Sequence, residues 1–148
     1  MSAARRNLLL EWGPVLAWAG LIFWFSAQPN LRFVSNESLD LVVRKIGHMG
    51  VFGILALLLW RALASAGAAR PALVAWILTG LYAASDEFHQ GFTAGRHPSP
   101  IDVSIDCLGA AIALTMLFAA RTAWARRRSA RYSSDATGSA RMLKPPST

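Results

Sequence analysis

The sequence contains little cysteine and little charge. Cys107 is the one cysteine among 148 residues, so a disulfide within the chain is excluded. Charged residues make up 16% of the chain, whereas apolar residues make up 54%. A soluble helical domain would carry charge along the outer faces of its helices. The pattern therefore indicates a membrane protein, and the length is enough for one compact domain.

The excess of basic residues does not indicate a nucleic-acid partner. The net charge is +7, but the basic residues gather at residues 5–6 and 121–131, beside apolar segments. This placement suits the anionic surface of a membrane. A nucleic-acid-binding domain would present Lys and Arg along one soluble face. We therefore expect membrane lipid, and no nucleic acid, as a partner.

Four apolar segments are expected to cross the membrane as helices. They cover residues 12–31, 46–64, 71–90 and 102–120. The first segment has no formal charge and would be about 30 Å long as a helix, enough to span a bilayer. A cleaved signal peptide is the alternative for it, but a cut after Ala27 would place Phe25 where a small residue is needed.

These segments predict an all-α fold, a polytopic membrane four-helix bundle over residues 12–120. A basic lead (residues 1–11) precedes it, and a basic, disordered tail (residues 121–148) follows it. Because three of the segments are short, a soluble four-helix bundle is an alternative. It is disfavoured because residues 55–60 and 110–120 are apolar on all sides.

Local signals add detail to the second segment. Asn36 is a candidate N-cap, and Glu37 and Asp40 are expected to form a solvated face beyond it. Glycines recur at every third residue, which predicts a narrow face for close approach of another helix. These glycines are Gly47, Gly50 and Gly53.

The distribution of Lys and Arg predicts the orientation of the bundle. With four spans, eleven basic residues fall on the side of both termini and four fall on the other side. The positive-inside rule then places both termini in the cytoplasm. It also places residues 82–106, which hold four of the eight carboxylates and two of the three histidines, near the outer surface. Such a polar cluster beside apolar spans is a candidate functional site.

The residue types in this cluster suggest acid–base and anion-binding chemistry. The candidate catalytic residues are Glu87, Asp86 and His48 because a carboxylate and an imidazole can transfer protons. The candidate substrate-binding residues are Lys45, Gln90, Arg96, Ser99, Asp102 and Asp106. A divalent metal ion is a possible cofactor for carboxylates with histidine. The alternative is structural, with Arg96 pairing with Asp86 or Glu87 and Lys45 pairing with Asp102 or Asp106.

Several of these residues follow an order that resembles the VanZ-like family. The motifs are Lys45-Ile-Gly-His48, Asp86-Glu-Phe-His-Gln90, Gly95-Arg96-His-Pro-Ser99, Asp102 and Asp106-Cys-Leu-Gly109. The resemblance covers residues 28–117, and the chain departs from the usual pattern at His97 and Asp106. It implies a multi-pass protein of the bacterial inner (plasma) membrane. The family takes its name from a protein linked to low-level resistance to a lipid-bearing glycopeptide antibiotic.

Two functions follow as hypotheses. The first is a protein that binds a cell-envelope component or a lipidated glycopeptide antibiotic at the outer membrane surface. The second is a metal-assisted hydrolase or transferase that acts on a lipid-linked envelope substrate. An ion-coupled carrier is disfavoured because a carrier needs polar residues at mid-depth of the membrane, whereas the polar residues of this chain are expected at one face.

Overall fold

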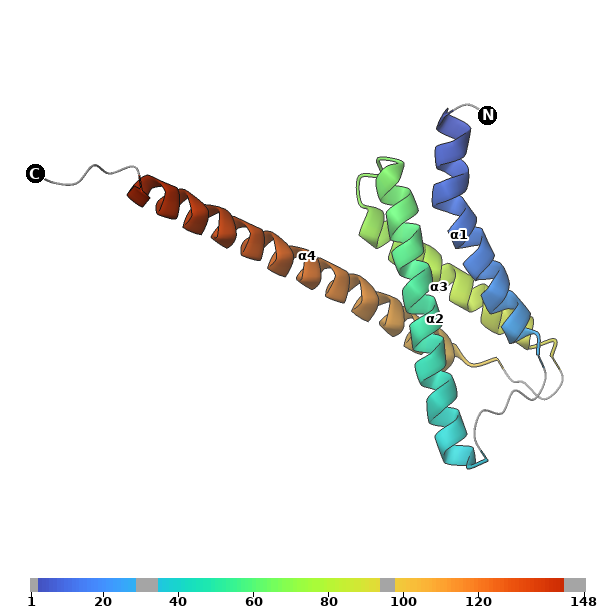
Figure 1. Ribbon diagram of the computed structural model, residues 1–148. Helices are drawn as coiled ribbons and strands as arrows, with labels where there is room; N and C mark the ends of the chain where they lie inside the picture. Colours follow the sequence, from blue (N-terminus) through green and yellow to red (C-terminus); the bar gives the residue numbers. More distant parts are fainter. Residues whose placement is uncertain (1–2, 29–34, 94–97, 143–148) are drawn as a thin grey trace, which may run out of the picture. The chain divides into compact units, whose positions relative to one another are not determined.

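The protein is all-α in the part of the chain that the computed structural model describes, as predicted. The backbone is described for residues 3–28, 35–93 and 98–142, and the side chains for residues 9–28, 35–93 and 98–130. The helices, drawn in Figure 1, are α1 (Ala3–Ser26), α2 (Glu37–Ser65), α3 (Pro71–Gln90) and α4 (Pro100–Met142). The chain divides into two compact units, residues 1–114 and residues 115–148.

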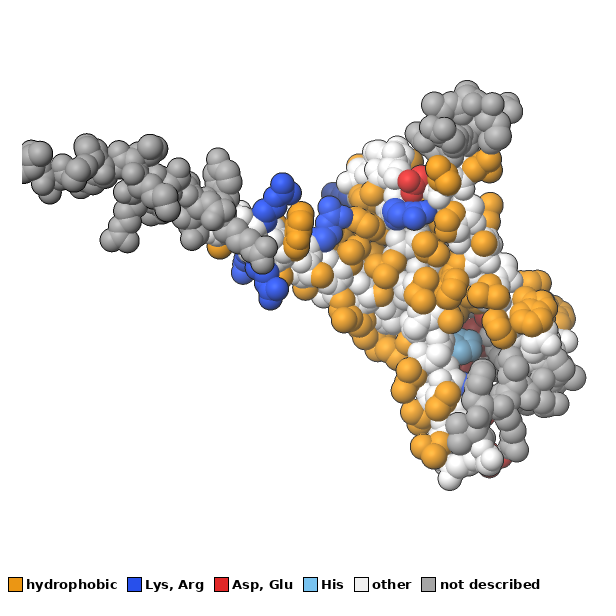
Figure 2. Space-filling view, in the orientation of Figure 1, with side chains coloured by type: hydrophobic (Ala, Val, Ile, Leu, Met, Phe, Trp, Pro, Cys, Tyr) orange, Lys and Arg blue, Asp and Glu red, His pale blue; other side chains and the backbone are white. Residues whose placement is uncertain are grey.

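Three of these helices are long and apolar enough to cross a membrane. They are Leu9–Ser26, Glu37–Ser65 and Pro100–Ala130, with mean hydropathies of 1.3, 1.7 and 2.0. The mean hydropathy of α3 is too low for a membrane span by this measure because Asp86, Glu87 and Gln90 occupy its last two turns. Large hydrophobic side chains are exposed throughout, and Figure 2 shows them spread over the visible face. The helices therefore form a membrane protein, with apolar surface where lipid would lie.

α2 begins earlier than its apolar segment predicts. Asn36 caps the helix, since its side chain accepts hydrogen bonds from the backbone N–H groups of Ser38 and Leu39 at 3.1 and 3.2 Å. This confirms the predicted N-cap and moves the helix start to Glu37. The prediction that Asp40 is solvated is wrong. Asp40 is 1% exposed, and its carboxylate lies 3.0 Å from Nε of Arg44, one turn along the same helix.

The core of the first unit lies where α1, α2 and α3 meet. Val15 and Ile22 of α1 pack in one buried cluster with Phe52 and Leu55 of α2 and Ala83 of α3. Polar hydrogen bonds also join these helices to one another. The indole N–H of Trp18 donates to the backbone oxygen of Val51 at 2.8 Å, and the Tyr82 hydroxyl donates to that of Ala19 at 2.6 Å.

Small residues bring the first part of α4 against α2. A Cβ added at Gly109 would lie 2.4 Å from the backbone oxygen of Met49, so the two backbones are almost in contact. A Cβ added at Gly53 would likewise lie 3.2 Å from Cβ of Ala113 and 3.3 Å from the backbone oxygen of Gly109. Of the glycines predicted to form a narrow face, only Gly53 does so. A Cβ at Gly47 or Gly50 would meet nothing within 4 Å.

α4 extends well beyond the predicted fourth span. The helix continues to Met142, so the backbone of residues 121–142, which the sequence placed in a disordered tail, is helical; residues 143–148 lie outside the described part. Ala and Arg, which favour helix strongly, make up most of residues 119–131 and carry the helix onward. Within this stretch the guanidinium of Arg128 lies over the ring of Trp124 at 5.5 Å.

Candidate functional site

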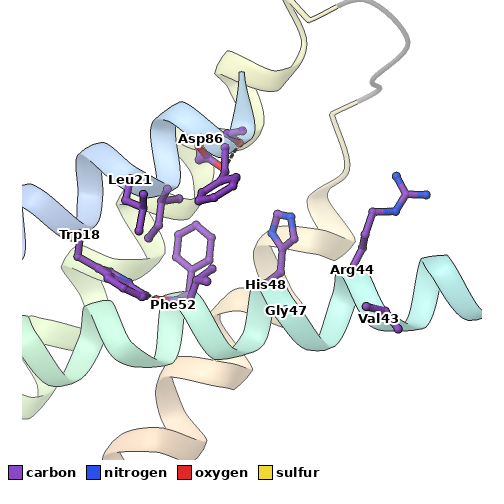
Figure 3. Close-up of a pocket in the computed structure, with 12 residues that line it drawn as sticks. Trp18, Leu21, Val43, Arg44, Gly47, His48, Phe52 and Asp86 are labelled. Carbon is purple, nitrogen blue, oxygen red and sulfur yellow. Dashed lines mark hydrogen bonds between the residues drawn. The ribbon is translucent and has the colours of Figure 1, made fainter. Parts of the chain in front are cut away.

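A cavity of about 410 Å³ opens between α1, α2 and α3, shown in Figure 3. Most of its wall is apolar. The lining residues are Trp18, Leu21, Ile22, Phe25, Ser26, Val43, Arg44, Gly47, His48, Val51, Phe52 and Asp86. His48 and Phe52 project from α2 toward Leu21 and Asp86 (Figure 3). Gly47 lines the cavity and has no side chain that would occupy part of it.

One wall of the cavity carries a buried polar network that joins α1 to α3. The Ser26 hydroxyl donates to Oδ2 of Asp86 at 2.6 Å. The side-chain amide of Gln90 donates to the same Oδ2 at 2.9 Å and to the Ser26 hydroxyl at 2.7 Å. All three residues are buried, with 3–5% of their surface exposed. The other oxygen of the Asp86 carboxylate, Oδ1, is buried without a hydrogen-bond partner.

Two ion pairs join α2 to the start of α4. Lys45 Nζ pairs with Oδ1 of Asp102, which was one of the two predicted partners. His48 Nδ1 lies 3.4 Å from Oδ1 of Asp106, and this forms an ion pair when the imidazole is protonated. Asp106 is only 1% exposed, so His48 covers a carboxylate that is out of contact with water.

Glu87 and His89 hold the last turn of α3 against its neighbours. A carboxylate oxygen of Glu87 accepts a hydrogen bond from the backbone N–H of Ser99 at 2.8 Å, which fixes the chain just before α4. The His89 ring lies 4.1 Å from the ring of Phe23 on α1. These contacts join the end of α3 to the chain before α4 and to α1.

The predicted site residues therefore fall into neighbouring groups. Asp86 and Gln90 lie at the α1–α3 contact, and Glu87 binds the backbone before α4. Lys45 and His48 of α2 pair with Asp102 and Asp106 of α4. His48 connects the groups, since it lines the cavity together with Asp86 and lies within electrostatic range of both Asp86 and Glu87. Arg96 lies outside the described residues, as does His97.

Sequence reasoning missed the contribution of α1. Ser26 binds Asp86, while Trp18, Leu21 and Phe25 form the apolar wall opposite α2. These residues sit within a segment that is apolar on every side, so its sequence does not mark an inward face. Arg44 was also missed as a lining residue. Its Nε pairs with Asp40, and Figure 3 shows its side chain extending away from Asp86.

The described side chains do not form an evident metal site. No group of three or more His, Cys, Asp or Glu residues among them is arranged so that it could hold a metal ion. His48 and Asp106 form a pair, and His89 turns toward Phe23. A proposal of metal chemistry therefore gains no support from the geometry of these residues.

The motifs that resemble the VanZ-like family occupy contact positions in the fold. Lys45 and His48 on α2 meet Asp102 and Asp106 on α4, and Gly109 is where the two backbones approach each other. A family model described as VanZ/LLP1 matches residues 12–121. No curated protein and no solved structure matches the chain. Since the matched residues cover most of the sequence, the chain belongs to the VanZ/LLP1 family.

Proposed function

We propose that this membrane protein binds an amphiphilic cell-envelope molecule, or a lipidated glycopeptide antibiotic, through the cavity between α1, α2 and α3. One observation carries the proposal. The cavity has apolar walls from Trp18, Leu21, Phe25 and Phe52 and a polar side at Asp86. Ligand sites are usually of this kind, largely apolar with a few placed polar groups.

The size of the cavity limits what can enter. Its volume of about 410 Å³ is near the lower end of the usual range of ligand pockets, about 300–1,000 Å³. A glycopeptide core is too large for this space, whereas a single aliphatic chain fits its apolar walls. The protein would therefore hold the chain of the ligand and leave the bulk of the ligand outside.

The proposed topology puts this binding at the outer surface. In the proposed orientation, α1 to α4 all cross the bacterial inner membrane, and both termini lie in the cytoplasm. The end of α1 and the end of α3 then face outward, where Ser26, Asp86 and Gln90 lie. A lipid-linked envelope molecule or a lipidated antibiotic would reach the cavity from that leaflet. Holding such an antibiotic away from its target is a resistance-type role.

A hydrolase or transferase acting on a lipid-linked substrate is the second candidate. His48 lines the cavity while Asp106 lies 3.4 Å from its Nδ1. A carboxylate behind an imidazole orients the ring and supports proton transfer at its other nitrogen. A bound substrate in the cavity would lie beside that ring.

Gly47 and Gly50 provide a matched pair of variants to test the proposal. Both glycines lie on α2 with nothing within 4 Å of an added Cβ, but only Gly47 lines the cavity. A leucine at Gly47 would extend into the cavity and reduce its volume, whereas a leucine at Gly50, which does not line the cavity, would not. Each variant is expressed in a bacterium susceptible to a lipidated glycopeptide, and the inhibitory concentration is measured for that drug and for a glycopeptide without a lipid chain.

The expected result is tolerance to the lipidated drug that Gly47→Leu abolishes and Gly50→Leu retains, with no effect on the chain-free drug. Native mass spectrometry of the purified proteins should show the lipidated drug bound to the wild type and to Gly50→Leu only. A bound drug of unchanged mass supports binding, and a cleaved or modified drug supports the enzyme. Equal binding by both variants would refute the cavity as the site.

A further inference from the structure

The unpartnered oxygen of Asp86 indicates the headgroup that the cavity accepts. We propose that the ligand is an aliphatic amphiphile with a protonated amine, and that this amine binds the Asp86 carboxylate. The inference rests on the proposed function, because it assumes that an aliphatic chain occupies the cavity. It adds the chemical class of the polar group beside that chain.

Asp86 has only part of its hydrogen-bonding capacity satisfied. Oδ2 accepts from Ser26 and Gln90, whereas Oδ1 is buried and has no hydrogen-bond partner. An ionised carboxylate offers about four acceptor positions. A buried polar oxygen without a partner is costly, so the site favours a ligand that supplies a donor. Asp86 is also one of the residues that line the cavity.

The charges around the cavity favour a cation as that donor. Among the described residues, the basic side chains near the cavity already face other carboxylates: Arg44 faces Asp40, Lys45 faces Asp102 and His48 faces Asp106. Ser26 and Gln90 are neutral donors, so neither places a positive charge beside the Asp86 carboxylate. A carboxylate in apolar surroundings gains most from an opposite charge that also donates hydrogen bonds.

An ammonium group meets both requirements. It carries three donors and a full positive charge, and an alkylamine is protonated at neutral pH, as a lysine side chain is. A hydroxyl supplies a donor but no charge. A carboxylate or phosphate headgroup would instead add negative charge beside Asp86 and Glu87, which are both buried. The expected order of affinity is therefore amine, then alcohol, then carboxylate.

Three amphiphiles with the same chain test this order: dodecylamine, dodecanol and dodecanoate. Each is added at equal concentration to the purified full-length protein in mild detergent, and occupancy is measured by native mass spectrometry. The same titration with Gly47→Leu gives the binding outside the cavity, which is subtracted. Wild type should bind dodecylamine about ten- to a hundredfold more tightly than dodecanoate, as expected for a hydrogen bond to a charged partner.

Asp86→Asn gives the second comparison, because it keeps the shape of the side chain and removes its charge. This variant should lose the preference for the amine, while Glu37→Gln, which changes an exposed carboxylate outside the cavity, should keep it. Should Asp86→Asn not fold, the headgroup series on the wild type still decides. Equal binding of all three amphiphiles in the cavity would overturn the inference but leave the proposed function intact. Binding that is the same in wild type and Gly47→Leu would overturn the proposed function as well.

Discussion

The contact between Gly109 and Met49 leads to a sharp prediction about stability. In Gly109→Ala, the new methyl carbon would lie 2.4 Å from the backbone oxygen of Met49 and 2.6 Å from its Cα. Neither atom is the free end of a side chain, so α2 and α4 must separate. Reaching an ordinary contact of 3.4 Å requires a displacement of about 1 Å, and overpacking of this kind costs about 1–3 kcal/mol.

Gly50→Ala is the matched control for this effect. Its Cβ meets nothing within 4 Å, so the variant gains only the better helix propensity of alanine, about 1 kcal/mol. Gly109→Ala has the same propensity gain but also the clash. The free energy of unfolding of Gly109→Ala should therefore lie about 1–3 kcal/mol below that of Gly50→Ala.

The measurement is reversible unfolding in mixed micelles of mild detergent and dodecyl sulfate, followed by tryptophan fluorescence. The chain has six tryptophans, and neither substitution removes one. The difference between the two unfolding free energies cancels effects common to any Gly→Ala change in a membrane helix. Equal stability of the two variants would show that α2 and α4 do not approach each other closely at Gly109.

Two further predictions concern the contact between α1 and α2 and the membrane topology. Trp18→Phe removes the indole donor to Val51 and should lower the unfolding free energy by about 1 kcal/mol, whereas Trp24→Phe, at an exposed position on the same helix, should change it by less than about 0.5 kcal/mol. Equal losses would argue against the hydrogen bond. Reporter fusions in the loop at residues 66–70 and after residue 142 should both report a cytoplasmic location. An extracytoplasmic signal at either position would reverse the proposed orientation.

Local signals in the sequence are enough to specify the helices and several of their ends. Long segments without charge predicted the helices, Pro71 and the breaker Gly91 bounded α3 correctly, and Asn36 caps α2 as expected. These signals are local, because a cap or a helix start depends on residues within one turn of each other. The order of the polar motifs along the chain likewise indicates the family, because it does not depend on how the helices pack.

Which of these residues meet depends on how the helices pack. The sequence allowed Lys45 to pair with Asp102 or Asp106, and the register between α2 and α4 at Gly109 selects Asp102 and leaves Asp106 to His48. Ser26 reaches Asp86 from a segment whose apolar pattern marks no inward face. The apolar composition of a segment determines that it can form a helix and enter a membrane. Contacts between helices depend on how their surfaces fit together, and the sequence of a single segment does not contain that information.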